Sequence, residues 1–519
     1  MCYHVRHFAP SKVGAHDMKA KKKPRILIVT PEITYLPAGM GNMANRMGAK
    51  AGGLADVSAS LVSTLFTLGA DVHVALPHYR QMFHVDVGHL ISNELRRYQE
   101  KLPDSRIHLA EDRMFYYRNT VYSNHDEENP RLALAFQREV INHIIGEVQP
   151  DLVHCNDWMT GLIPGLARRL GIPSLFTIHN IHTHKLTLER VENAGIDAAE
   201  FWSNLYYERP PWNYEESRST NPVDLLASGI FAAHYINTVS PTFLREIVDG
   251  YHDFVPDSIR SEITSKFRAG CAEGILNAPD DSYDPGTDEA LPVRYSAYNV
   301  ADGKLAAKRL LQKELGLDQD DSAPVIYWPS RLDPVQKGCQ LLADVLYRLV
   351  HEHWDRKLQF AIIANGSYQR VFRDIANFHG IQNRVAVCDF DERLSRLAYA
   401  GADFMLMPSR FEPCGLPQMV APMYGTLSIA RNTGGLHDTV IPLDAATHTG
   451  NGILFNDYDA GAIHWAVGEA MRFLDLPADL RLANLQRIML ESRERFNHDV
   501  CARAYIDMYE RMLARPLVP

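Results

Sequence analysis

The chain has 519 residues, which is too long for one hydrophobic core and predicts two large domains. Its net charge of −10 argues against the cationic surface of a nucleic-acid-binding protein. No apolar run approaches the roughly 20 residues of a membrane-spanning helix. Residues 1–23 are polar and basic without the apolar core of a secretory signal, so we expect a disordered leader and no membrane association.

The seven cysteines are scattered along the chain and include no C-x-x-C pair. An odd number of cysteines without metal-ligand spacing is typical of free thiols in a reducing compartment. The sequence therefore predicts a cytoplasmic protein without disulfide bonds.

Short, β-rich apolar runs alternate with longer amphipathic segments through the first half of the chain. Residues 25–31 (RILIVTP) predict a strand, residues 53–70 predict a helix, and residues 71–77 predict the next strand. Further strands are predicted over residues 150–157, 173–180 and 234–241. This alternation of strand and helix predicts a parallel, doubly wound α/β sheet.

A segment rich in Pro, Asp and Gly interrupts the pattern, and a second strand series follows it. The second series is predicted over residues 323–331, 358–366, 383–390, 402–410 and 426–435. The resulting organisation is a leader (1–23), a first domain (24–285), a linker (286–305), a second domain (306–497) and a closing helix (498–519). Because ligands bind at the carboxyl ends of strands in open α/β sheets, two such domains predict a cleft with chemistry on both walls.

Three turns have the composition of phosphate-binding loops. KAGGLADV starts at Lys50 and brings a cation and two glycines to a helix start, SRLDPVQKG holds Arg331 and Lys337, and RNTGGL provides a second Gly-Gly turn at Gly434. Backbone N–H groups at such turns attract anions, and paired cations suit a diphosphate. Each turn also has a plainer interpretation, as a helix start or a solvated surface turn.

A single carboxylate, Glu412, lies in the Pro-Gly turn of PSRFEPCGLPQ, directly after a predicted buried strand. The thiol of Cys414, two residues later, is interpreted as a small neighbour in that turn and not as a nucleophile. The histidines of TIHNIHTH match no common zinc spacing and have no adjacent carboxylate, so we expect no metal there. The D-x-D at Asp389 and Asp391 is interpreted as a capped turn before a helix.

In combination, these motifs resemble those of the bacterial glycogen synthase and plant starch synthase family. The matching elements are Lys-x-Gly-Gly-Leu at 50–54, His-x-x-Asp-Trp at 154–158, Thr-Ile-His-Asn at 177–180, Val-Ser-Pro-Thr at 239–242, Phe-Glu-Pro-Cys-Gly-Leu at 411–416 and Thr-Gly-Gly-Leu-x-Asp-Thr-Val at 433–440. The resemblance implies a GT-B fold with two Rossmann-like domains, no cofactor and no metal. It implies transfer of glucose from ADP-glucose or UDP-glucose to the non-reducing end of an α-1,4-glucan, with retention of configuration.

The resemblance also implies individual roles. Five residues would contact the reacting glucose or its leaving diphosphate: Glu412, Lys337, Arg331, His179 and Asp157. A second set would bind the donor phosphates and nucleoside: Lys50, Gly52, Gly53, Asp56, Asn277, Phe390, Cys414, Gly415, Leu416, Thr433, Gly434 and Gly435. The family picture is front-face attack by the acceptor, with Glu412 as a covalent nucleophile left as the alternative.

Several features depart from the family pattern, and two of them lie near the expected acceptor side. An insertion rich in Gly, Met and Asn separates Glu32 from Lys50, and it is interpreted as a mobile lid or as a loop without a role. NIHTHKL replaces the family's Ala-Tyr-Gln-Gly after His-Asn, which leaves the acceptor contacts open. The alternatives to a working synthase are a glucan-binding or priming protein with little turnover, and another GT-B sugar-nucleotide enzyme.

Overall fold

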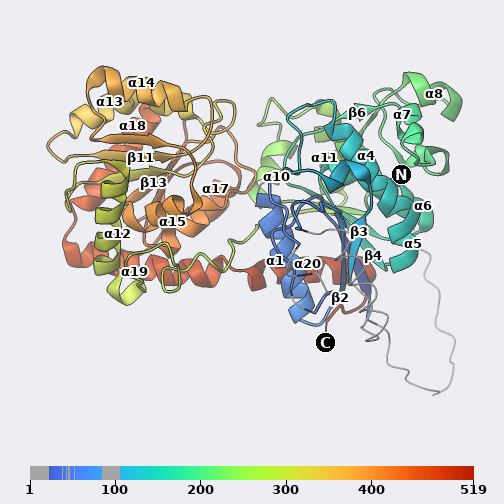
Figure 1. The fold of residues 1–519 in the computed structure, drawn as a ribbon, viewed down its shortest axis with the longest axis horizontal. Coiled ribbons are helices and arrows are strands. Elements are labelled where there is room, and N and C mark those ends of the chain that lie inside the picture. Colours follow the sequence, from blue (N-terminus) through green and yellow to red (C-terminus); the bar gives the residue numbers. More distant parts are fainter. Residues whose placement is uncertain are drawn as a thin grey trace, which may run out of the picture.

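A computed structural model of the chain describes residues 23–84 and 106–518, apart from 38, 42–43, 45–46 and 52. The predicted leader (1–23) therefore lies outside the described residues except for Lys23. In the described part, the chain forms two α/β domains that lie side by side, each around its own parallel sheet (Figure 1). The prediction of two doubly wound domains is confirmed.

The sheet of the first domain contains seven parallel strands among the described residues. They are β1 (Arg25–Val29), β2 (Asp71–Pro77), β3 (Ile107–Ala110), β4 (Leu152–Asn156), β5 (Ser174–Ile178), β8 (Tyr235–Thr238) and β9 (Ala272–Gly274). Their order is β3-β2-β1-β4-β5-β8-β9. The inner strands β4 and β5 are buried at every residue, as expected for a sheet covered by helices on both faces. The order reverses between β1 and β4, and this reversal is where such sheets bind ligands.

The sheet of the second domain has six parallel strands and the same kind of reversal. They are β10 (Val325–Trp328), β11 (Gln359–Ile363), β12 (Val385–Cys388), β13 (Phe404–Met407), β14 (Leu427–Arg431) and β15 (Gly452–Phe455). Their order is β12-β11-β10-β13-β14-β15, so the strand order turns between β10 and β13. The turns carrying Arg331, Lys337 and Glu412 follow these two strands. A separate antiparallel pair, β6 (Lys185–Leu186) and β7 (Val223–Asp224), belongs to the first domain.

Helices cover both sheets. In the first domain they are α1 (Gly53–Thr67), α3 (Arg113–Tyr116), α4 (Asn129–Glu139), α5 (Ile145–Val148), α6 (Ile163–Leu170), α7 (Leu188–Asn193), α8 (Tyr214–Thr220), α9 (Leu225–Ala232), α10 (Pro241–Val248) and α11 (Asp257–Arg268). In the second they are α12 (Val300–Leu315), α13 (Cys339–Glu352), α14 (Gln369–His379), α15 (Glu392–Gly401), α16 (Pro417–Met423), α17 (Gly434–Thr439), α18 (Ala460–Leu474) and α19 (Ala478–Arg495). None of the helices in the described ranges is long and apolar enough to span a bilayer.

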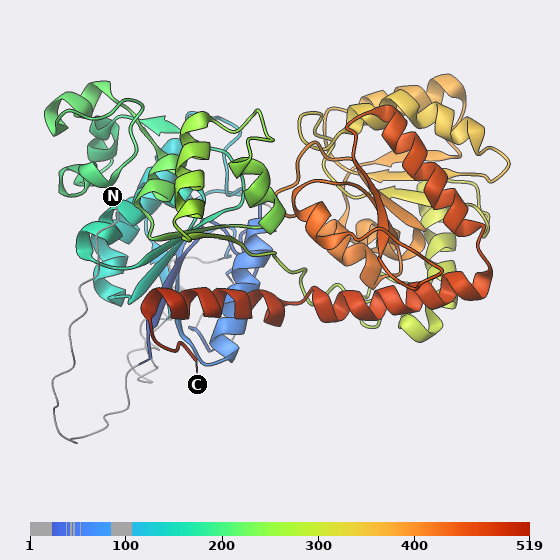
Figure 2. The same cartoon turned by 180° about the vertical axis from the view of Figure 1, so that it is seen from behind.

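The last helix, α20 (His498–Leu513), runs back from the second domain to the first (Figure 2). It begins where Asn497 caps it by accepting the Val500 N–H at 3.1 Å. The Tyr509 hydroxyl then lies 2.7 Å from Nδ1 of buried His154 on β4. Helix α20 is thus bonded to the first sheet through Tyr509.

The predicted linker (286–305) ends earlier than expected. Ser296 and Asn299 form a capping box, so α12 begins at Val300 and the last residues of that range are helical. Asp288 is buried and accepts a hydrogen bond from the Tyr424 hydroxyl of the second domain at 2.5 Å. The connecting segment therefore packs on the second domain and is not a free linker.

The insertion between Glu32 and Lys50 folds onto the first domain. A backbone bridge joins Ile33 to Ala49 at its ends. Its described apolar residues lie in the core of the domain, with Met40 1% and Met47 4% exposed. Met43, the third methionine of the segment, lies outside the described residues. Because apolar burial holds Met40 and Met47 in the core, the described residues of the insertion pack against the first domain. This packing disagrees with the interpretation as a mobile lid.

Candidate active site

The turn after β13 brings two of the predicted residues into direct contact. Lys337 Nζ donates to Glu412 Oε2 at 2.6 Å, and the Ser409 hydroxyl donates to the same oxygen at 3.0 Å. Glu412 is only 5% exposed. A carboxylate at this depth must be paired and hydrogen-bonded to stay charged, and these two donors meet that need. The pair is a rigid acid–cation unit at the carboxyl edge of the second sheet.

Glycine is required in the turn that follows. Gly415 has φ +74°, a conformation that side chains with a Cβ rarely adopt. An added Cβ there would lie 2.4 Å from the amide of Gln418, whose Nε2 bonds the Cys414 carbonyl at 2.9 Å. Burial raises the pKa of the Cys414 thiol, so this cysteine stays protonated and is unsuited to act as a nucleophile. The turn leads directly into α16 after Leu416.

The second Gly-Gly turn is not an open phosphate cradle in this structure. The N–H of Gly434 and the hydroxyl of Thr433 both donate to the carboxylate of Glu246, from α10 of the first domain, at 3.0 to 3.2 Å. The N–H of Gly435 donates to the Glu412 carbonyl at 2.9 Å. Since these donors are already used by protein oxygens, the start of α17 is a domain contact.

The glycines of that turn are explained by close packing. A Cβ added at Gly434 would lie 2.0 Å from the carbonyl oxygen of Glu412, and one added at Gly435 would lie 1.9 Å from that of Cys414. Only glycine allows α17 to lie directly against the Glu412 turn. Gly434 and Gly435 therefore allow α17 to pack against the backbone of the turn that holds the Glu412 carboxylate.

Arg331 is the cation of the site that remains unengaged. It is exposed, and within the described ranges no hydrogen bond or ion pair involves its guanidinium. Its turn is fixed to the Glu412 turn, because the Arg410 N–H donates to the Gln336 carbonyl at 2.7 Å. Lys337 and Arg331 are thus held on one loop with different exposure, the first paired and the second open to a ligand.

The Lys-x-Gly-Gly loop of the first domain approaches the same turn. A Cβ added at Gly53 would lie 3.6 Å from the Leu416 side chain, which places the start of α1 beside the turn before α16. Lys50 is paired with Asp56 at 2.9 Å, and Asp56 also accepts from the Thr34 hydroxyl at 2.6 Å. Gly52 lies outside the described residues.

Asp157 has a strained backbone and a carboxyl group with a raised pKa. Its φ is 56°, which a non-glycine residue rarely adopts. Its Oδ1 accepts the His179 N–H at 2.7 Å. Burial raises the pKa of Asp157 to about 7, against the opposing effect of the N–H groups of His179 and Asn180. A carboxyl group poised near neutral pH at a strand end is typical of a functional site.

His179 is neutral with one defined tautomer. Burial lowers its pKa to about 3. Asn156 Nδ2 donates to the Val29 carbonyl at 3.1 Å, which turns Asn156 Oδ1 toward His179 Nε2 at 2.9 Å. Because that oxygen only accepts, Nε2 carries the proton and Nδ1 is left as an acceptor.

The predicted nucleoside contacts lie on both sides of the domain boundary. Asn277 is buried, and its Oδ1 has no hydrogen-bond partner. Phe390 is 53% exposed and follows β12. The carboxylates beside it are engaged by the protein, since Asp389 accepts from Gln369 at 2.8 Å and Asp391 caps α15 through the Leu394 N–H at 2.7 Å. This arrangement agrees with the capped-turn interpretation of the D-x-D.

Four residues of the site region were not predicted as site residues. Glu246 and Asp438 join the domains, and Asp438 accepts from the hydroxyl of Thr242 at 2.6 Å and from that of Ser240. Ser409 holds Glu412, and Glu32 accepts the Ala51 N–H at 2.6 Å to shape the Lys50 loop. Asp438 and Ser409 could have been found from their position in the quoted elements, whereas Glu246 and Glu32 lie outside them.

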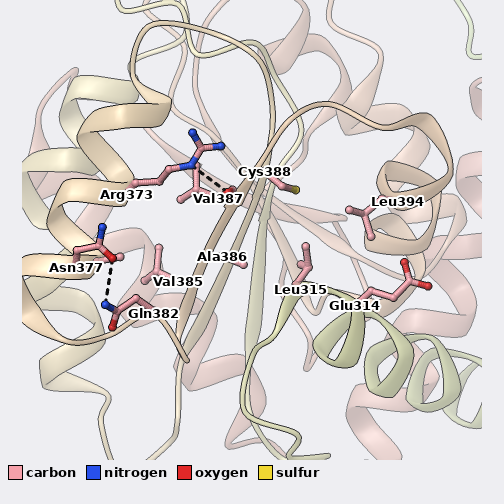
Figure 3. Close-up of a pocket in the computed structure, with 11 residues that line it drawn as sticks. Glu314, Leu315, Arg373, Asn377, Gln382, Val385, Ala386, Val387, Cys388 and Leu394 are labelled. Atoms are coloured by element: carbon pink, nitrogen blue, oxygen red, sulfur yellow. Dashed lines mark hydrogen bonds between the residues drawn. The ribbon is translucent and has the colours of Figure 1, made fainter.

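A separate surface pocket of about 390 Å³ lies beside the edge strand β12 (Figure 3). Arg373 and Asn377 border it from α14, and Glu314 and Leu315 from the end of α12. None of the predicted site residues lines it, so this pocket is separate from the candidate site.

Comparisons with known proteins agree with this architecture. A family model described as starch synthase catalytic domain matches residues 25–258, and one described as glycosyl transferases group 1 matches residues 323–472. A glycogen synthase from Exiguobacterium sibiricum is 34% identical over 443 residues, covering 79% of this chain and 86% of the relative. A glycogen synthase from Geotalea uraniireducens is 32% identical over 524 residues, covering 95% and 99%.

Among solved structures, the catalytic domain of Starch Synthase IV from Arabidopsis thaliana, bound to ADP and acarbose, matches with a TM-score of 0.74 and 25% identity. The match covers 95% of this chain and all of that one. It confirms the GT-B fold that the motifs implied. Given this fold, the two family models and relatives that align over most of their length, the chain belongs to the glycogen synthase and starch synthase family of glycosyltransferases.

Proposed function

We propose that this protein transfers glucose from ADP-glucose or UDP-glucose to the 4-OH at the non-reducing end of an α-1,4-glucan, with retention of configuration. The observation that carries the proposal is the buried pair of Lys337 and Glu412, held by Ser409 at the carboxyl edge of the second sheet. A carboxylate held beside a fixed cation suits a sugar with several hydroxyls joined to an anionic leaving group.

In this proposal the second domain binds the donor. Lys337 and exposed Arg331 stabilise the departing diphosphate, and the backbone at Gly415 and Leu416 contributes N–H groups at the start of α16. Lys50 and Gly53 close on the same phosphates from the first domain, supported by the nearness of Gly53 to Leu416. Asp56, Asn277 and Phe390 contact the nucleoside, with the unpartnered Oδ1 of Asn277 as an acceptor.

The role of Glu412 is to hold the donor glucose and not to attack it. Its Oε2 already accepts from Lys337 and Ser409, which lowers its nucleophilicity. The departing phosphate then takes the acceptor proton as the 4-OH attacks the same face. Preorganised donors and acceptors stabilise the charge that develops, without reorganisation during the step.

Asp157 and His179 supply the opposite wall. Neutral His179, with Nδ1 as an acceptor, suits a sugar hydroxyl donor better than a charged imidazolium would. Thr433, Gly434 and Gly435 act in this scheme by positioning the Glu412 turn. The reaction is placed in a reducing cytoplasm, supported by six free cysteines in the described residues.

The experiment supplies radiolabelled ADP-glucose or UDP-glucose with and without glycogen, and measures free nucleotide diphosphate and label in glucan. A synthase releases diphosphate only with acceptor and lengthens the glucan. Binding without release would favour a non-catalytic glucan-binding protein, and release without glucan label would favour another sugar-nucleotide enzyme. The ADP ligand of the plant starch synthase supports an adenosine donor, so the ADP-glucose arm is expected to be the faster.

A further inference from the structure

Three side chains with metal-binding atoms converge on the first domain, beside the candidate active site. They are Asp126, His182 and His184, and one ligand atom from each lies within 4.8 Å of the others. The two Nε2 atoms of the histidines are 3.2 Å apart, and His184 Nε2 lies 3.8 Å from Asp126 Oδ1. No other group of three His, Cys, Asp or Glu side chains meets this criterion in the part of the chain that the structure covers.

This cluster is not recognisable from the sequence, because its carboxylate is distant from the two histidines along the chain. Asp126 lies in the turn before α4, whereas both histidines follow β5. The expectation of no metal at TIHNIHTH rested on the histidine spacing and on the absence of a carboxylate nearby in sequence. The fold brings the carboxylate of Asp126 from another loop, and this third ligand could not be recognised from the sequence around the histidines.

The histidine loop is fixed from behind. The hydroxyl of Thr183, between the two histidines, donates to Asp224 at 2.7 Å and accepts the Leu226 N–H at 3.0 Å. The carbonyl of His184 accepts the Leu225 N–H at 3.0 Å. Because Thr183 is anchored to β7 and the start of α9, the two flanking imidazoles are held together without any need for a ligand to order the backbone.

Trp158 covers the other side of the imidazoles. Its ring centroid lies 4.5 Å from that of His184 and 5.6 Å from that of His182, and Trp158 is itself buried. The Asp126 carboxylate is largely exposed and closes the cluster from the solvent side. The arrangement places two imidazole nitrogens beside the indole ring, with one exposed carboxylate on the solvent side.

We infer that Asp126, His182 and His184 bind one divalent transition-metal ion of the zinc class. Two nitrogens bound to one tetrahedral zinc, each at about 2.0–2.1 Å, are separated by roughly 3.4 Å, close to the distance between these two atoms. Two imidazoles and a carboxylate suit Zn²⁺, Fe²⁺, Co²⁺ or Ni²⁺, whereas Mg²⁺ and Ca²⁺ prefer oxygen ligands only. The fourth position is open to water.

The ion has a positioning role and takes no part in glucosyl transfer. It joins the turn before α4 to the loop that carries His179, three residues before His182, and it lies against Trp158, the neighbour of Asp157. Metal binding therefore fastens the wall of the first domain that faces the sugar. Binding of the ion is tested separately from glucosyl transfer, so its outcome does not depend on whether the proposed donor chemistry is correct.

The test uses the full-length chain, stripped with EDTA and dialysed, and titrated separately with Co²⁺, Zn²⁺ and Mg²⁺. Wild type is expected to bind one equivalent of Co²⁺ with a visible d–d absorption band. Zn²⁺ should displace the bound Co²⁺, and Mg²⁺ should not bind. His184→Ala and His182→Gln each lose a ligand and should weaken Zn²⁺ binding by about 100-fold or more, since even indirect partners of metal ligands cost 10–100-fold. Asp126→Asn should weaken it by roughly 10-fold or more.

The matched control is His143→Ala, which removes an exposed histidine that has one neighbouring carboxylate, Glu139, at 3.9 Å but no second imidazole. This variant should bind Co²⁺ and Zn²⁺ as wild type does. Circular dichroism identifies any variant that misfolds. Because His182 is exposed, His182→Gln is expected to fold, and its Zn²⁺ affinity can be compared with that of wild type. The inference is overturned if wild type shows no saturable Zn²⁺ binding, or if His182→Gln and Asp126→Asn retain wild-type affinity; the two histidines are then only hydrogen-bonded to each other.

Discussion

Lys337 and Glu412 are 75 residues apart in the sequence, and the structure joins them by a hydrogen-bonded ion pair of 2.6 Å. Both side chains are nearly buried, so neither charge is screened well by water. The donor must therefore bind to a site whose main cation and main anion are already oriented. Loss of either charge should therefore lower the rate of transfer.

Replacing either partner should lower kcat far more than it weakens glucan binding. Glu412→Gln and Lys337→Met each remove one charge-assisted contact to the reacting groups, worth ~3–4 kcal/mol or roughly 100- to 1000-fold in rate. Initial rates at saturating donor and a glycogen-binding assay measure the two effects separately. Because the residues act as a unit, the double variant should be only slightly slower than the worse single variant.

Arg370→Ala is the matched control for this comparison, because its side chain is 90% exposed on α14. It should leave kcat unchanged. Near-normal turnover in Glu412→Gln or Lys337→Met would remove that residue from the proposed catalytic groups.

Transfer should not depend on a metal at the D-x-D. The carboxylates of Asp389 and Asp391 are bonded to Gln369 and to the backbone of α15, as in a capped turn. Asp389→Asn should keep activity within about threefold, since it changes only an exposed hydrogen bond from Gln369 and an exposed ion pair with Arg373 at 4.0 Å. Activity lost in excess EDTA and restored by Mn²⁺ in wild type, but not in Asp389→Asn, would establish a metal role for this motif.

The pH dependence of stability should show the raised pKa of Asp157. In the folded chain its pKa is about 7 instead of 3.8, so the folded state keeps a proton that the unfolded state has lost. The stability associated with this proton is present below pH 3.8 and is lost as pH rises to about 7. Relative to Asp157→Asn, the free energy of unfolding of wild type should thus fall across this window.

Urea unfolding of both proteins at about pH 5 and about pH 8 measures the difference. His179 has the opposite sign, because its pKa is lowered to about 3 and its contribution is lost as pH falls below 6.5. That contribution is shared by wild type and Asp157→Asn and cancels in the comparison. Parallel pH curves for the two proteins would show that Asp157 titrates normally.

Removing one hydroxyl of α20 should destabilise the whole first domain. Thr177 donates to Asn237 at 2.6 Å, so it must accept from His154 Nε2, and Nδ1 of His154 must accept from the Tyr509 hydroxyl. Tyr509→Phe leaves that buried nitrogen unpaired, at a cost of about 1–3 kcal/mol. A lower Tm by thermal unfolding is expected.

The matched control is Tyr298→Phe, at a tyrosine that is 81% exposed and has no such partner role, and its Tm should equal that of wild type. An unchanged Tm in Tyr509→Phe would mean that α20 does not depend on this hydrogen-bond chain.

Changes in the insertion before Lys50 should destabilise the first domain. Met40 is 1% exposed, so Met40→Ala removes buried contacts and should cost about 2–5 kcal/mol of unfolding free energy. Trimming residues 37–48 should lower the Tm as well as alter kinetics. Unchanged melting after trimming, together with a raised acceptor KM, would restore the interpretation of the segment as a lid.

The sequence alone determined the two parallel sheets and the motif-bearing turns after their strands. Both follow from local patterns: buried β-rich runs alternate with amphipathic helices, and Gly, Pro and charged residues occur where strands end. The turn of Glu412 was predictable for the same reason, since Pro413 and Gly415 act on their immediate neighbours.

The partners of those turns were decided only by the tertiary structure. The Glu246 carboxylate accepts the Gly434 N–H, the Tyr509 hydroxyl bonds His154, and the Asp126 carboxylate lies 3.8 Å from His184, each across a long stretch of chain. Local composition predicts that an N–H or an imidazole will be available, but it does not contain the position of a distant side chain. That position depends on how helices and sheets pack, and packing is set by contacts between segments far apart in sequence.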